Sequence, residues 1–136
     1  MPEPPRYVPD RELPAVPYLP GRSPRPLRAP GGGHAWAVDL YNAGCFWEAH
    51  EAWEELWRVE TDGQARARLQ GLILAAAACL KLVLGNERAF VALAGRAVLR
   101  LGAADDAWAT AFADELRAFA AGPEARVAFR PRLWLT

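Results

Sequence analysis

The chain has 136 residues, a length that suits one domain with a single hydrophobic core. Hydrophobic residues make up 52% of the sequence and charged residues 24%, which is typical of a globular protein. The formal net charge is zero, so overall charge gives no basis for binding nucleic acid or a membrane. Nucleic acid therefore ranks last among the partners considered, and no membrane association is expected.

Residues 1–32 contain ten of the twelve prolines, so this segment cannot form a regular helix or an inner strand. Its apolar side chains, among them Tyr7, Leu13 and Tyr18, favour an extended arm docked on the domain over a disordered tail. We therefore divide the chain into a proline- and arginine-rich arm, residues 1–32, and a single helical domain, residues 33–136.

The spacing of apolar residues after the arm predicts five helices, over about residues 34–41, 46–58, 64–84, 87–101 and 105–121. Turn or capping residues separate the first four, at 42–44, 61–63 and 85–86. The apolar run at 71–80 is too short to span a membrane. No strand pattern with turn signals occurs. The predicted fold is all-α, a bundle of about five helices built from antiparallel hairpins, with a proline-rich extended N-terminal arm.

The two cysteines, Cys45 and Cys79, do not have the spacing of a metal site and are expected to be small buried side chains. The N-terminal segment lacks the apolar core of a signal peptide. These features predict a cytoplasmic protein with reduced thiols.

The chemistry of the chain is concentrated in the second predicted helix. On a helical wheel, His50 falls within the apolar face, and Glu54 follows it by four residues, within reach of the imidazole. The imidazole is therefore expected to be at least partly buried, and a buried imidazole needs a partner, which is Glu54, a backbone carbonyl, a metal ion or a substrate. If the partner is a divalent metal ion, His50 and Glu54 are its ligands, and Glu51 is a third ligand or a general base. His34, the only other histidine, is a further ligand candidate, and its alternative is an exposed residue in the first turn of a helix.

Four other polar or aromatic residues are expected to surround this site as pocket residues or as partners of the ligands. They are Trp47, Trp57, Gln70 and Asn42. The sequence His-Glu-x-x-Glu at 50–54 differs from the His-Glu-x-x-His of zinc proteases, and two histidines exclude a three-histidine site in one subunit.

The sequence Tyr-Asn-x-Gly-x-Phe-x-Glu-Ala-His-Glu-x-x-Glu-x-x-Trp at 41–57, followed by Leu-Gln-Gly-Leu-Ile at 69–73 and Gly85-Asn86, resembles the DUF309 family. The resemblance covers roughly residues 10–103. It implies a small helical protein of unknown function, and members are sometimes labelled predicted metal-dependent hydrolases. Where the family often has a histidine between two prolines, this chain has Arg25, so that position supplies no metal ligand here.

Two functional hypotheses remain open on the sequence alone. The first is a metal-dependent hydrolase centred on His50 and Glu54, which requires both side chains to face water. The second is a non-enzymatic helical interaction module, in which His50 and Glu54 form a buried structural pair and an exposed apolar patch binds the partner. That partner is not specified by the sequence: it is a small molecule, another protein or a second copy of this chain.

Overall fold

The computed structural model describes residues 3–22, 31–122 and 131–135. These residues contain five α-helices and, in this part of the chain, no strand. The helices are α1 (Gly33–Asn42), α2 (Phe46–Val59), α3 (Gly63–Val83), α4 (Glu87–Ala103) and α5 (Ala107–Ala120). Their bounds lie within about two residues of the predicted ones, the usual uncertainty of a helix end. The predicted all-α bundle is confirmed.

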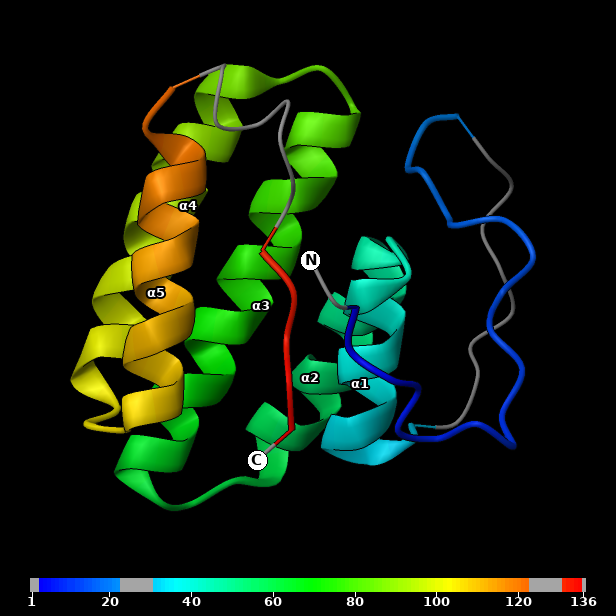
Figure 1. Cartoon of the computed structure of the whole chain (residues 1–136), viewed down its shortest axis with the longest axis horizontal. Coiled ribbons are helices and arrows are strands. Elements are labelled where there is room, and N and C mark those ends of the chain that lie inside the picture. The colour runs from blue at the N-terminus through cyan, green and yellow to red at the C-terminus, as the bar shows by residue number, and fades with distance from the viewer. Residues whose placement is uncertain (1–2, 23–30, 123–130, 136) are drawn as a thin grey trace.

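Each helix packs against the next one in the sequence, so that α1 contacts α2, α2 contacts α3, α3 contacts α4 and α4 contacts α5. The longest helix, α3, lies between the α1–α2 pair on one side and the α4–α5 pair on the other (Figure 1). This central position explains its composition, since α3 buries apolar side chains toward both neighbours.

The turns follow local sequence chemistry. Gly44 and Gly85, just after α1 and α3, have φ angles of 86° and 84°, a left-handed conformation that favours glycine. At helix starts, Asp62 accepts a hydrogen bond from the backbone of Ala65, and Asn86 accepts one from Ala89. These bonds satisfy N–H groups in the first turn of each helix, which have no carbonyl partner within the helix.

The core is aromatic at the junction of α1, α2 and α5. Tyr41 and Trp53 are fully buried, and the ring of Tyr41 lies 5.6 Å from that of Phe46 and 5.8 Å from that of Phe112. Between α3 and α4 the packing is closer, because Gly71 lacks a side chain. A Cβ atom at Gly71 would lie 2.6 Å from Cγ of Leu101. The small residue therefore permits the close approach of these two helices.

The N-terminal segment contacts α1 through one buried carboxylate. Asp39 accepts hydrogen bonds from the backbone N–H groups of Tyr7 and Val8, both at 2.8 Å. It also forms an ion pair with Arg6 at 3.0 Å. Tyr18 reaches α2, where its N–H donates to Glu48 at 3.0 Å. The separation of the chain into an arm, residues 1–32, and a helical domain remains a prediction.

The C-terminal residues run across the bundle as an extended segment, shown in red in Figure 1. Asn42, at the end of α1, donates to the carbonyl of Leu133 at 2.8 Å and accepts from its N–H at 2.9 Å. On the other side, the indole of Trp108 in α5 donates to the carbonyl of Trp134. The segment therefore ties α1 to α5 although the two are far apart in sequence.

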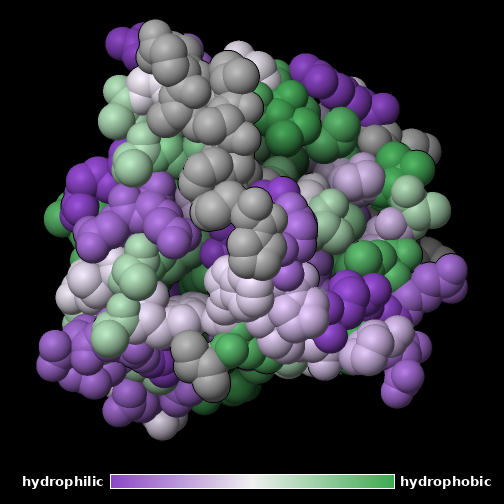
Figure 2. Space-filling model, viewed as in Figure 1, coloured by the Kyte–Doolittle hydropathy of each residue, from purple (hydrophilic) through white to green (hydrophobic). Residues whose placement is uncertain are grey.

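The face of the molecule in Figure 2 carries hydrophobic residues in separate groups, interspersed with hydrophilic ones. The described part of this face therefore does not present the broad apolar patch expected of an interaction module. Among the described residues, no helix is both long enough and apolar enough to cross a membrane.

Candidate functional site

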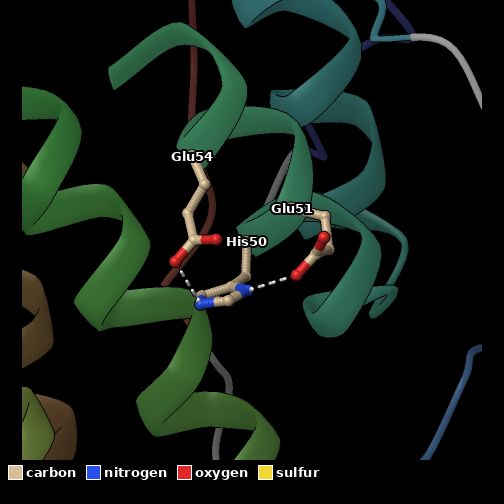
Figure 3. A group of neighbouring side chains, drawn as sticks. All are labelled: His50, Glu51 and Glu54. Carbon is tan, nitrogen blue, oxygen red and sulfur yellow. Dashed lines mark ion pairs between the residues drawn. The ribbon is translucent and has the colours of Figure 1, made fainter. Parts of the chain in front are cut away.

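The predicted cluster of His50, Glu51 and Glu54 forms on the surface of α2. All three side chains project from this one helix, with the imidazole between the two carboxylates (Figure 3). The Nε2 atom of His50 lies 3.2 Å from Oε1 of Glu54, and its Nδ1 atom lies 3.6 Å from Oε1 of Glu51. The spacing of four residues explains the closer contact, since residues i and i+4 are neighbours on a helix.

The cluster is half-exposed. The side chain of His50 is 25% exposed, and those of Glu51 and Glu54 are 32% and 30% exposed. These fractions show that the pair is neither sealed in the core, as a purely structural pair would be, nor fully solvated. Water and small solutes can therefore reach the imidazole and both carboxylates.

A positively charged side chain lies beside this cluster. Arg58, one turn after Glu54, places its guanidinium 3.4 Å from Oε2 of Glu54. Glu54 thus has one oxygen toward His50 and the other toward Arg58. An exposed pair of this kind contributes little to stability, but the positive charge lowers the attraction of the site for another cation.

His34 is not part of this cluster, although the sequence made it a candidate ligand. It lies at the start of α1, where its Nδ1 atom accepts a hydrogen bond from the buried indole of Trp53 at 3.0 Å. It is half-buried, so the alternative of an exposed first-turn residue is wrong. Burial, and to a lesser extent the positive charge of Arg68, lowers the pKa of His34 below its ordinary value.

His34 instead lines a cleft of about 400 Å³ formed by the start of α1, the end of α2 and the first half of α3. Its polar lining residues are His34, Glu60 and Arg68, and its apolar wall includes Leu56 and Leu72. This cleft was not predicted from the sequence. No local signal in the sequence indicated it, because its lining residues come from three different helices and the turn after α2.

The four expected pocket residues lie in different surroundings. Trp47 packs edge-on against Tyr18 of the N-terminal segment, with ring centroids 4.6 Å apart. Trp57 lies under the guanidinium of Arg66, 4.3 Å from its ring centroid. Gln70 is half-buried on α3, and Asn42 holds the C-terminal segment as described above.

Glu48 and Asp39 are two buried or half-buried acids that the site prediction omitted. Burial raises the pKa of Glu48, and the hydrogen bond from the N–H of Tyr18 offsets part of this increase. One carboxylate oxygen of Glu48, Oε1, is buried and has no hydrogen-bond partner among the described residues. For Asp39 the sequence carried a signal, because it is an isolated acid within the apolar run 35–41.

No curated protein and no solved structure matches this chain. A family model does match, over residues 35–93, which include most of α1, all of α2 and α3, and the start of α4. This segment contains the cluster of His50, Glu51 and Glu54 and is shorter than the 10–103 inferred from the sequence motifs. The family model that matches residues 35–93 is that of DUF309, a domain of unknown function.

Proposed function

We propose that this chain binds a divalent metal ion through His50 and Glu54, and that the bound ion serves a hydrolytic reaction. The observation that carries the proposal is the distance of 3.2 Å between Nε2 of His50 and Oε1 of Glu54. Two atoms that share a metal ion at bond lengths of about 2.1 Å and tetrahedral or octahedral angles lie about 3.0–3.4 Å apart. One imidazole and one carboxylate suit zinc, manganese or iron.

A metal ion uses only one nitrogen of an imidazole ring, and this requirement separates the roles of the two glutamates. With the metal ion at Nε2, Nδ1 of His50 carries a proton and faces Glu51. Carboxylates commonly accept this second hydrogen bond and so fix the orientation of a metal-binding histidine. The present separation of 3.6 Å is longer than a hydrogen bond, so Glu51 must move slightly closer in the metal-bound form.

Glu51 is also the candidate general base, and this role makes a different demand. A general base must reach the water molecule that attacks the substrate. Glu51 faces the ring edge opposite Glu54, so as a base it must turn away from Nδ1 of His50. A positioning role predicts that Glu51→Gln weakens metal binding, whereas a role as base predicts that the same change lowers activity at saturating metal.

Two protein ligands on one helix leave most of the coordination shell to water, substrate or a ligand from elsewhere. An ion with open positions polarises a substrate oxygen or activates a bound water molecule for hydrolysis. The half-exposed position of His50 and Glu54 supports this arrangement, because both side chains are accessible to solvent.

The proposal is tested by calorimetric titration of the metal-stripped protein with zinc and with manganese. We expect binding at one site per chain, lost in His50→Ala and in Glu54→Gln. Glu115→Gln, which removes an exposed carboxylate on α5, is the control and should bind like the wild type. Arg58→Gln should bind more tightly, because it removes the positive charge beside Glu54.

Hydrolysis is tested separately, with chromogenic ester and phosphate substrates and the metal-loaded protein. Activity that depends on metal and is absent in His50→Ala supports the second half of the proposal. If the stripped protein binds neither metal, or binds equally well in His50→Ala, the proposal is wrong. The alternative is then a non-enzymatic helical module in which His50 and Glu54 are a structural pair.

A further inference from the structure

The cleft beside His34 does not belong to the His50 cluster, since none of His50, Glu51 and Glu54 lines it. Its volume of about 400 Å³ lies within the range of small-molecule sites in proteins, about 300–1,000 Å³. It also has the usual composition of such sites, an apolar wall with a few polar groups. Leu56, Leu69 and Leu72 provide the wall, and His34 and Arg68 provide hydrogen-bond donors.

The donor at His34 is fixed by its surroundings. Trp53 donates its indole N–H to Nδ1 of His34, so the proton of the neutral imidazole is carried by Nε2. Trp108 packs edge-on against the same ring, with centroids 5.8 Å apart. The bond and the ring contact together fix the imidazole plane. Among the described residues Nε2 has no hydrogen-bond acceptor, so this N–H is available to a ligand.

Arg68 is held in place by Asp106, which caps α5. A guanidinium nitrogen lies 2.6 Å from one carboxylate oxygen of Asp106, and the other oxygen accepts from the backbone of Trp108. A guanidinium carries five N–H groups, and within the described part of the chain this pair is the one hydrogen bond of Arg68. Further donors therefore remain for an anion in the cleft.

The third polar residue of the cleft, Glu60, has a structural role. One of its carboxylate oxygens accepts the backbone N–H groups of Thr61 and Asp62, at 3.0 and 3.2 Å, in the turn before α3. These bonds occupy one carboxylate oxygen and hold the side chain in the turn. The electrostatic influence on His34 comes instead from Arg68, whose positive charge contributes to the lowered pKa of the imidazole. The positive charge of Arg68 therefore favours an anion beside the imidazole.

We propose that this cleft is a binding site for a small organic carboxylate with an apolar body. The carboxylate accepts hydrogen bonds from Nε2 of His34 and from the guanidinium of Arg68. The apolar body lies on the wall formed by Leu56, Leu69 and Leu72. A medium-chain fatty acid fits this description, and octanoate is the probe we choose.

The test is calorimetric titration of the full chain with octanoate, in parallel with octanol and octylamine as neutral and cationic analogues. We expect octanoate to bind at one site per chain with a Kd below about 1 mM, and the two analogues to bind at least about tenfold more weakly. Arg68→Gln and His34→Phe should each weaken octanoate binding by about tenfold or more. Arg96→Gln, which removes an exposed arginine of α4, is the control and should leave binding unchanged.

Because Arg68→Gln also breaks the pair with Asp106, a second variant leaves both donors intact. Ala65 lines the cleft from the first turn of α3, and Ala65→Trp fills the space beside it. This variant should fold with the helical circular dichroism of the wild type and lose octanoate binding. The proposal is overturned if octanoate shows no saturable binding up to about 1 mM. It is also overturned if octanol binds as well as octanoate, or if Ala65→Trp binds normally.

Discussion

The buried carboxylate of Asp39 in α1 accepts a hydrogen bond from the backbone N–H of Tyr7, 32 residues earlier, at 2.8 Å. Its second oxygen accepts the N–H of Val8 and faces the guanidinium of Arg6. The side chain is 1% exposed, so these three groups take the place of water. A buried charge is tolerated only when it is paired and hydrogen-bonded in this way, and the N-terminal segment provides all three partners.

The first prediction concerns this carboxylate. Asp39→Ala removes three hydrogen bonds and leaves two backbone N–H groups without an acceptor. We expect the free energy of unfolding to decrease by about 2–4 kcal/mol, measured by urea denaturation. Trypsin should also cleave after Arg6 and Arg11 faster than in the wild type, because the segment that carries them loses its attachment. Asp10→Asn, an exposed change in the same segment, is the control. A variant with unchanged stability and unchanged cleavage would contradict the prediction.

A second prediction uses two glycines that differ in their surroundings. A Cβ atom at Gly71 would meet Leu101 of α4 at 2.6 Å, whereas at Gly95 it would meet no atom within 4 Å. We expect Gly71→Ala to decrease the free energy of unfolding by about 1–3 kcal/mol, because it forces α3 and α4 apart. Gly95→Ala should increase it by about 0.5–1 kcal/mol, because alanine is the better helix former at an exposed position. Thermal or urea denaturation measures both. Equal effects at the two sites would show that α3 and α4 tolerate a wider spacing.

The fold was largely predictable because its signals are local. The apolar period, the caps at Asp62 and Asn86 and the glycine turns at Gly44 and Gly85 all act within a few residues. On α2, Ala49 and Trp53 are buried, as their helical spacing predicts, but Trp57, which the same spacing places on that face, is only half-buried. A helical wheel predicts on which side of a helix a residue lies, but not how far the neighbouring helices extend over it. Here the Trp57 ring lies at the edge of the core, where the guanidinium of Arg66 covers it.

The candidate site was predictable only where it lies on a single helix. His50, Glu51 and Glu54 were found together because residues i and i+4 must be neighbours. The surroundings of His34 depend on which helices meet, and the sequence does not give that pairing directly. The hydrogen bond from Trp53 and the neighbouring Arg68 place His34 in a separate cleft, apart from the three residues on α2. The attachment of Tyr7 to Asp39 is likewise a contact between distant segments.

A third prediction concerns the pH dependence that Glu48 introduces. Burial raises the pKa of its carboxyl group above the ordinary value of 4.5. The folded chain therefore binds this proton more tightly than the unfolded chain, so Glu48 makes the protein less stable as the pH rises from about 4.5 through the raised pKa. Glu48→Gln has no titrating group at this position, so it should not show this loss of stability. The difference in unfolding free energy between Glu48→Gln and the wild type should therefore increase with pH in that range, measured by urea denaturation.

The control for Glu48 is Glu115→Gln, an exposed glutamate on α5. Its difference from the wild type should stay constant over the same pH range. If Glu48→Gln also shows a constant difference, its carboxyl group does not titrate differently in the folded and unfolded chains, and the prediction fails.

The last prediction concerns His34, whose effect has the opposite sign. Its pKa is lowered from 6.5 by burial and by Arg68, so the folded chain binds this proton less tightly than the unfolded chain. The protein should therefore lose stability as the pH falls from about 6.5 through the lowered pKa. Protonation at Nδ1 also breaks the hydrogen bond from Trp53, because that nitrogen then carries a proton of its own. The indole N–H resonance of Trp53 should shift over the same pH range in NMR spectra.

The two histidines of the chain provide a matched comparison. His34→Gln keeps an acceptor for Trp53 but has no titrating group, so it should lose less stability between pH 6.5 and the lowered pKa than the wild type does. His50→Gln leaves the bond between His34 and Trp53 in place, so the shift of the Trp53 indole resonance should persist in that variant. A shift that disappears in His50→Gln and persists in His34→Gln would assign the titration to the α2 cluster instead, and the tautomer of His34 on which the carboxylate site depends would have to be abandoned.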